Sequence, residues 1–100
     1  AYLLRDEVHG ALDRDSEAIT DLDKVIEIDA DSVTARVNRA VLHYNDGRYD
    51  LALADMDHVI GLDAADPDHY ENRAEIHRMM GRPELQARDL RRAGERRAAA

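Results

Sequence analysis

The sequence contains no cysteine, no phenylalanine and no tryptophan, and its four aromatic residues are all tyrosine. Without cysteine the chain can form no disulfide, no thiolate nucleophile and no Cys-based zinc site. Its core must be built from Leu, Ile, Val, Ala and Met, which suit the narrow gaps between packed helices. No apolar run approaches the ~20 residues of a membrane-spanning helix. We therefore expect no membrane partner and a cytoplasmic location.

Positive charge is scarce in the first two-thirds of the chain. The net charge is −8, with 6 basic against 16 acidic residues in 1–66 and 8 against 6 in 67–100. An acidic surface repels phosphate, so no nucleic-acid partner is expected. The basic end lacks aromatic residues that could stack on bases, and it is interpreted as a solvated helix face. Its arginines are Arg88, Arg91, Arg92, Arg96 and Arg97.

An internal repeat of 34 residues organises the chain. Residues 1–32 match residues 33–66 at 11 positions, where unrelated stretches would match at about two or three. These positions include Ala18/Ala52, Asp21/Asp55, Asp23/Asp57, Val25/Val59 and Ile26/Ile60. The second and third copies share, among others, Asn38/Asn72, Ala40/Ala74, Gly47/Gly81, Leu51/Leu85 and Asp55/Asp89.

The 34-residue period and the positions of the small residues resemble those of the tetratricopeptide repeat (TPR) family, whose repeat is a 34-residue helix–turn–helix unit. In the second copy Ala40, Gly47, Ala52 and Met56 follow that pattern, whereas the first Trp and the last Pro are replaced by Arg36 and Ala64. The resemblance implies an all-α, right-handed superhelical solenoid of three repeats, 1–32, 33–66 and 67–100, in one domain. Because the chain starts without Met, we also expect it to be a piece of a longer protein.

Apolar periodicity and turn residues predict the same helices independently of the family. Asp46-Gly47-Arg48 and Gly81-Arg82-Pro83 are typical of turns, and Asp66-Pro67 is typical of a helix start. Six antiparallel helices are predicted, at about 1–12, 15–29, 33–46, 49–63, 67–80 and 83–97.

Charged residues recur at matching places of the repeats. An arginine at a packed position between helices needs an anion, because a buried unpaired charge is costly. We therefore predict three ion pairs of equal spacing, which are Arg5–Asp21, Arg39–Asp55 and Arg73–Asp89. The open alternative is that these side chains are exposed and match only through common ancestry.

Histidine also recurs, at His9, His43 and His77. Equivalent residues of successive repeats lie about a helix diameter apart, ~10 Å, which is too far for one metal ion. We interpret them as packing residues and expect no metal and no cofactor. The acidic pairs two residues apart point to different helix faces, and no Ser–His pair or phosphate-binding loop is present. We expect no enzymatic activity.

The resemblance implies that the first helix of each repeat lines a concave groove that binds a peptide or helix of a partner. The predicted groove residues are Leu3, Glu7, Thr34, Val37, Asn38, Val41, Tyr44, Asn45, Glu71, Asn72, Glu75 and Arg78. For Val37, Val41 and Tyr44 the alternative of packing on neighbouring repeats stays open. Because the groove has an apolar middle and an acidic end, we expect a basic-apolar protein or peptide partner.

Two other functions remain open at this point. The chain could stack end to end as a self-assembly element, so its oligomeric state is not predicted. It could also be the regulatory domain of a larger protein. In either case the identity of the partner lies beyond the sequence, because TPR modules serve many processes.

Overall fold

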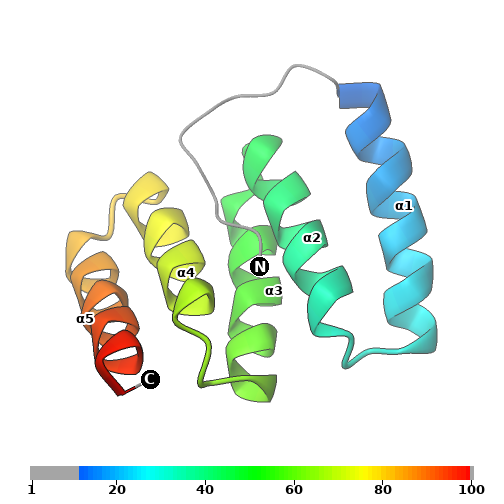
Figure 1. Ribbon diagram of the computed structural model, residues 1–100. Helices are drawn as coiled ribbons and strands as arrows, with labels where there is room; N and C mark the ends of the chain where they lie inside the picture. Colours follow the sequence, from blue (N-terminus) through cyan, green and yellow to red (C-terminus); the bar gives the residue numbers. More distant parts are fainter. Residues whose placement is uncertain (1–11, 100) are drawn as a thin grey trace.

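The computed structural model describes the backbone of residues 12–99 and the side chains of residues 16–99. This part of the chain forms five helices and no strand: α1 (Leu12–Ile28), α2 (Val33–Asn45), α3 (Tyr49–Leu62), α4 (Pro67–Met79) and α5 (Pro83–Ala99). The helices stand side by side in chain order, and each runs opposite to the one before it (Figure 1). The fold is all-α, as predicted.

The first predicted helix, 1–12, falls almost entirely outside the described residues, so five of the six predicted helices can be compared. The break predicted near residues 13 and 14 is wrong, because α1 already begins at Leu12. In the second and third copies the turn depends on Gly47 and Gly81, whose φ angles of 75° and 71° favour glycine. The first copy has Asp13 at this place, and the helix continues through it.

Both glycine turns close their helices in the same way. Arg48 N–H donates to the carbonyl of His43 at 2.8 Å, five residues back, and Arg82 N–H donates to His77 at 2.9 Å. This bond and the left-handed glycine form a Schellman end, which satisfies carbonyls that the helix leaves without a partner. The two turns therefore set α2 against α3 and α4 against α5 with one geometry.

Side-chain caps begin the two helices that open a repeat. The Ser32 hydroxyl accepts from Ala35 N–H at 3.3 Å, and an Asp66 carboxylate oxygen accepts from Asp68 N–H at 2.9 Å. Pro67 occupies the first turn of α4, where its missing N–H would have had no helical partner. Each cap stabilises its helix by about 1 kcal/mol.

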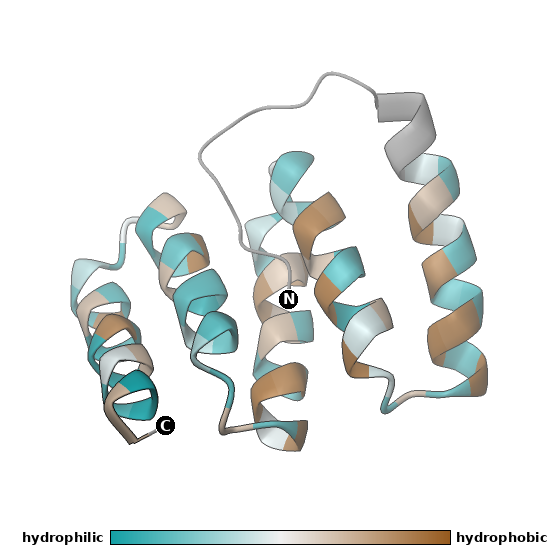
Figure 2. Ribbon diagram, in the orientation of Figure 1, coloured by the Kyte–Doolittle hydropathy of each residue, from teal (hydrophilic) through white to brown (hydrophobic). Residues whose placement is uncertain are grey.

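The core lies where α2, α3 and α4 meet. Ala40 and Ala52 have no exposed surface, and their small side chains let α2 and α3 approach closely. Met56, Val59 and Ile76 are also fully buried and join three helices in one cluster. Apolar residues are prominent on α1, α2 and α3, whereas α4 and α5 are more hydrophilic (Figure 2). Truncation of Met56 to alanine would cost about 2–5 kcal/mol.

None of the helices between residues 12 and 99 is long and apolar enough to cross a membrane.

Candidate functional site: a charge ladder and an inner helix row

Two of the three predicted ion pairs lie in the described part of the chain, and both are bidentate. Arg39 donates to the two carboxylate oxygens of Asp55 at 2.8 and 2.7 Å. Arg73 donates to Asp89 in the same way, with both distances 2.8 Å. Asp55 and Asp89 are only 2% and 1% exposed, so each buried carboxylate depends on its arginine. The third predicted pair includes Arg5, which lies outside the described residues.

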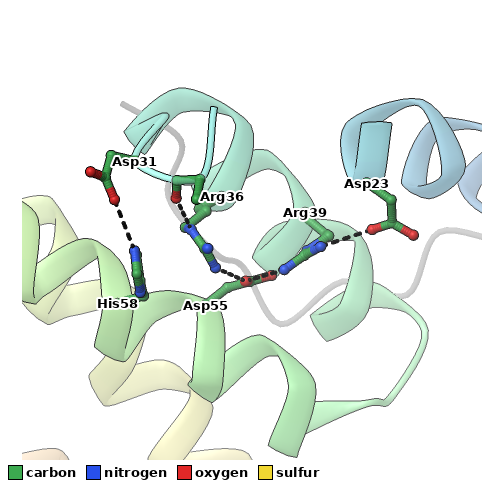
Figure 3. Close-up of polar contacts among 7 residues, drawn as sticks. Asp23, Asp31, Arg36, Arg39, Asp55 and His58 are labelled. Carbon is green, nitrogen blue, oxygen red and sulfur yellow. Dashed lines mark hydrogen bonds and ion pairs between the residues drawn. The ribbon is translucent and has the colours of Figure 1, made fainter. Parts of the chain in front are cut away.

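Each arginine also binds an aspartate of the preceding repeat, which the sequence analysis did not predict. Arg39 Nη1 donates to Asp23 at 2.8 Å, and Arg73 Nη1 donates to Asp57 at 3.1 Å. One guanidinium thus joins both helices of its own repeat to the helix before them (Figure 3). We call these four aspartates and two arginines the charge ladder. The signal for it was present, because Asp23 and Asp57 recur at the 34-residue period.

Arg36 strengthens the ladder at the place where the TPR pattern has tryptophan. Its Nη1 donates to Asp55 at 3.2 Å, and its Nε donates to the carbonyl of Ala30 at 2.7 Å (Figure 3). The hydrogen bond to Asp55 raises the pKa of Arg39, and the bond to Asp89 raises that of Arg73. The ion pairs therefore hold both arginines in their charged form, and the ladder serves structure.

His43 and His77 are buried beside the ladder aspartates. His77 Nε2 lies 3.7 Å from Asp89, and the Nδ1 atoms of both histidines are buried without a hydrogen-bond partner. Burial lowers the pKa of both imidazoles, although the nearby aspartates act in the opposite direction. Both rings are therefore neutral at pH 7 and pack between helices.

Three of the predicted groove residues lie in the interior. Val37 and Tyr44 are 5% and 4% exposed and belong to the core cluster, so the packing alternative describes them. The Tyr44 hydroxyl donates to Glu75 Oε2 on α4 at 2.5 Å, and its ring meets that of Tyr49 edge to face. Asn72 is 1% exposed. Val37 and Tyr44 are covered because α4 of the next repeat lies against this side of α2.

The remaining predicted residues of α2 form a continuous surface row. Thr34 is exposed, and Asn38, Val41 and Asn45 are half-buried. The last three follow each other by three and four residues, so they share one helix face. The Asn38 and Asn45 side chains make no hydrogen bond to any residue of the described range. We call Thr34, Asn38, Val41 and Asn45 the inner row. The predicted groove residues Leu3 and Glu7 lie outside the described residues.

The acidic end of the predicted groove is occupied by the chain's own arginines. Arg97 of α5 binds both Asp68 (3.1 Å) and Glu71. Arg78 donates two hydrogen bonds of 2.7 Å to Glu75. The bonds from Arg78, and then that from Tyr44, lower the pKa of Glu75. The ionised form of Glu75 is thus favoured, and all three carboxylates already have partners within the chain.

One group in the described range has the atoms that a metal ion could use. Asp63, Asp66 and His69 place one ligand atom each within 4.8 Å of one another, and His69 is 2% exposed. The group occupies the positive end of the α4 dipole, and the Arg96 guanidinium binds the adjacent Ala64 carbonyl at 2.9 Å. Both oppose a cation. His69 Nε2 lies 3.2 Å from Asp63, so these residues fasten the loop between α3 and α4.

Comparison with known proteins supports the fold of the chain but does not assign it to a family. No protein-family model matches the sequence, and no curated protein matches it significantly. Among solved structures, one titled MamA MSR-1 C2 superimposes with a TM-score of 0.81 at 23% sequence identity. The match covers 86% of this chain and 49% of that one, so the chain spans about half the length of that structure. This likeness supports a TPR-like helical-repeat fold, and the right-handed superhelix stays a prediction.

Proposed function

We propose that the chain is a non-catalytic module that binds a segment of another protein on the inner row of α2. The observation that carries the proposal is the pair of amides, Asn38 and Asn45, on either side of the half-buried Val41. Buried polar groups elsewhere in the ladder and the caps are paired within the chain. These two amides lie on a helix next to an apolar side chain, and neither has a hydrogen-bond partner among residues 16–99.

The chemistry of this row suits a polypeptide. A carboxamide both donates and accepts, so each asparagine can form a hydrogen bond with either an N–H or a C=O group of a bound segment. Each such hydrogen bond contributes about 0.5–1.5 kcal/mol net. Val41 offers contact to one apolar side chain of the ligand. Because α2 is held by core contacts on its other side, binding requires little ordering of the site.

The partner we propose is basic as well as apolar, and the structure limits where its charge can act. The net charge of −8 attracts a basic segment over distance. Close contact with Asp68 and Glu71 is already taken by Arg97. A basic ligand residue would have to displace Arg97, so we expect charge to affect the association rate more than the affinity.

The test is selection from a library of random 12-residue peptides, followed by titration of the winners against the full chain. We expect apolar-basic sequences, and we expect Asn38→Ala/Asn45→Ala to weaken their binding about 10- to 100-fold, from two lost hydrogen bonds. Asp50→Ala, exposed in the first turn of α3, is the matched control and should bind normally. Equal binding by the double variant and the control would exclude the inner row.

A further inference from the structure

The contacts between repeats in the charge ladder all run from an arginine back to an aspartate, and this series ends at α5. At both observed junctions, an arginine on the first helix of a repeat reaches an aspartate on the helix before it: Arg39 to Asp23 and Arg73 to Asp57. These acceptors are 34 residues apart, and the next place in the series is residue 91. That residue is Arg91. A further helix of the same kind would therefore bring its arginine against another arginine.

Other residues of the third repeat are also more polar than their counterparts in the second repeat. Tyr44 of α2 is buried, whereas the residue at the same place on α4, Arg78, is exposed. Val37, likewise buried, corresponds to Glu71, which Arg97 holds. The end of the third repeat thus lacks the apolar surface with which the second repeat receives its neighbour.

The outer face of α5 nevertheless keeps a shallow apolar strip. Leu90 is 48% exposed, whereas Met56, its counterpart on α3, is fully buried. One turn further, Gly94 has open space around it, and a side chain there would meet nothing within 4 Å. Arg91 borders the strip on the helix surface, and it makes no ion pair with any residue from 16 to 99. The face therefore combines a place where a helix can approach closely with unpaired positive charge.

We propose that this outer face of α5 binds a helix of a partner protein that carries a carboxylate where the repeats carry their ladder arginine. Leu90 and Gly94 would contact the apolar side of that helix, and Arg91 would bind its carboxylate. The series of ion pairs would continue across the interface, but with the arginine on α5 and the carboxylate on the partner helix. This surface is separate from the inner row, so the inference does not depend on the proposed function.

Two other occupants fit less well. A second copy of this chain would present the ladder arginine itself, as Arg39 and Arg73 do, and like charges would meet at Arg91. A nucleic acid would be repelled by the net charge of −8, and the exposed Glu84 and Glu95 lie on the same helix.

The probe for this surface is a stapled helical peptide of residues 67–80, because α4 shows how such a helix lies on α3. One peptide keeps the ladder arginine and the other carries Arg73→Glu. Fluorescence anisotropy at low ionic strength measures their binding to the full chain. We expect the Arg73→Glu peptide to bind at least about fivefold more tightly, as one partly exposed ion pair gives ~1 kcal/mol. The Arg91→Asp protein should reverse this preference.

Controls separate docking from general charge and from unfolding. Arg82→Asp makes the same change of charge in the turn before α5 and should leave the preference as in the wild type. Gly94→Gln fills the open space and should abolish binding of both peptides while circular dichroism stays unchanged. The proposal is overturned if neither peptide binds, if Arg91→Asp leaves the preference as it was, or if single-stranded RNA binds through Arg91 instead. Dimerisation that depends on Arg91 would also overturn it.

Discussion

Replacing Arg73 alone should lower the stability of the fold far more than replacing Arg73 and Asp89 together. Arg73→Leu restores the residue type of the TPR pattern but leaves Asp89, whose side chain is 1% exposed, without its two hydrogen bonds. Removing one partner of such a buried pair costs about 3–5 kcal/mol. A domain of this size has a total stability of roughly 5–15 kcal/mol, so the single variant would lose much of it.

The double variant Arg73→Leu/Asp89→Ala removes the stranded charge together with its partner. Replacing a buried ion pair by apolar groups is often neutral or stabilising, so most of the loss should be recovered. Asp57 also loses a bond, but its side chain is 56% exposed and water replaces the arginine. The prediction is therefore a coupling between the two sites of about 3 kcal/mol.

Urea unfolding followed by circular dichroism at pH 7.5 measures these differences. The control is Arg88→Leu, which replaces an exposed arginine of α5 and should change the stability by less than about 0.5 kcal/mol. A cost of less than about 1 kcal/mol for Arg73→Leu would contradict this prediction and would mean that water satisfies Asp89. A double variant as unstable as the single one would also contradict it, because the loss would then come from other contacts of Arg73.

Three further predictions concern single features of the fold. Gly47→Ala should cost about 1–2 kcal/mol in urea unfolding, because φ is 75° there, although the added methyl group meets nothing; an unchanged midpoint would refute the strain. Ser32→Ala should cost about 1 kcal/mol through the lost cap and leave the helical signal intact. Burial lowers the pKa of His43 and His77, so the unfolded chain binds more protons and stability should fall as the pH drops below about 6.5. Melting temperatures at pH 8 and pH 5.5 test this, and His43→Tyr/His77→Tyr should remove most of the difference.

The sequence predicted the later helices and the ion pairs within the second and third repeats, where a repeated residue has one physical role. Arg39 and Asp55 recur together at a fixed spacing, and a buried arginine requires an anion, so their contact followed from chemistry. The bond to Asp23 joins two repeats, so the spacing of charges within one repeat does not indicate it. The 34-residue period places a turn at Asp13, but aspartate adopts the left-handed conformation of Gly47 less readily than glycine does.

The depth of a side chain was harder to predict than its helix face. Val37 and Val41 are one turn apart on α2, yet the first is buried and the second only half-buried. Which of them is covered depends on how closely the next repeat approaches, and that distance is set by side chains of α4. The pairing of Glu71 with Arg97 has the same origin, because it joins residues 26 apart that no repeat pattern relates.

The central claim, that the inner row of α2 binds a protein segment, is tested most directly by nuclear magnetic resonance. A ¹⁵N-labelled full chain is titrated with a library-selected peptide, and the shifts of the backbone and asparagine amide signals are followed. We expect the largest shifts between Thr34 and Asn45, with the side-chain amides of Asn38 and Asn45 among them. Shifts centred on the outer side of α3, with both asparagine side chains unchanged, would contradict it.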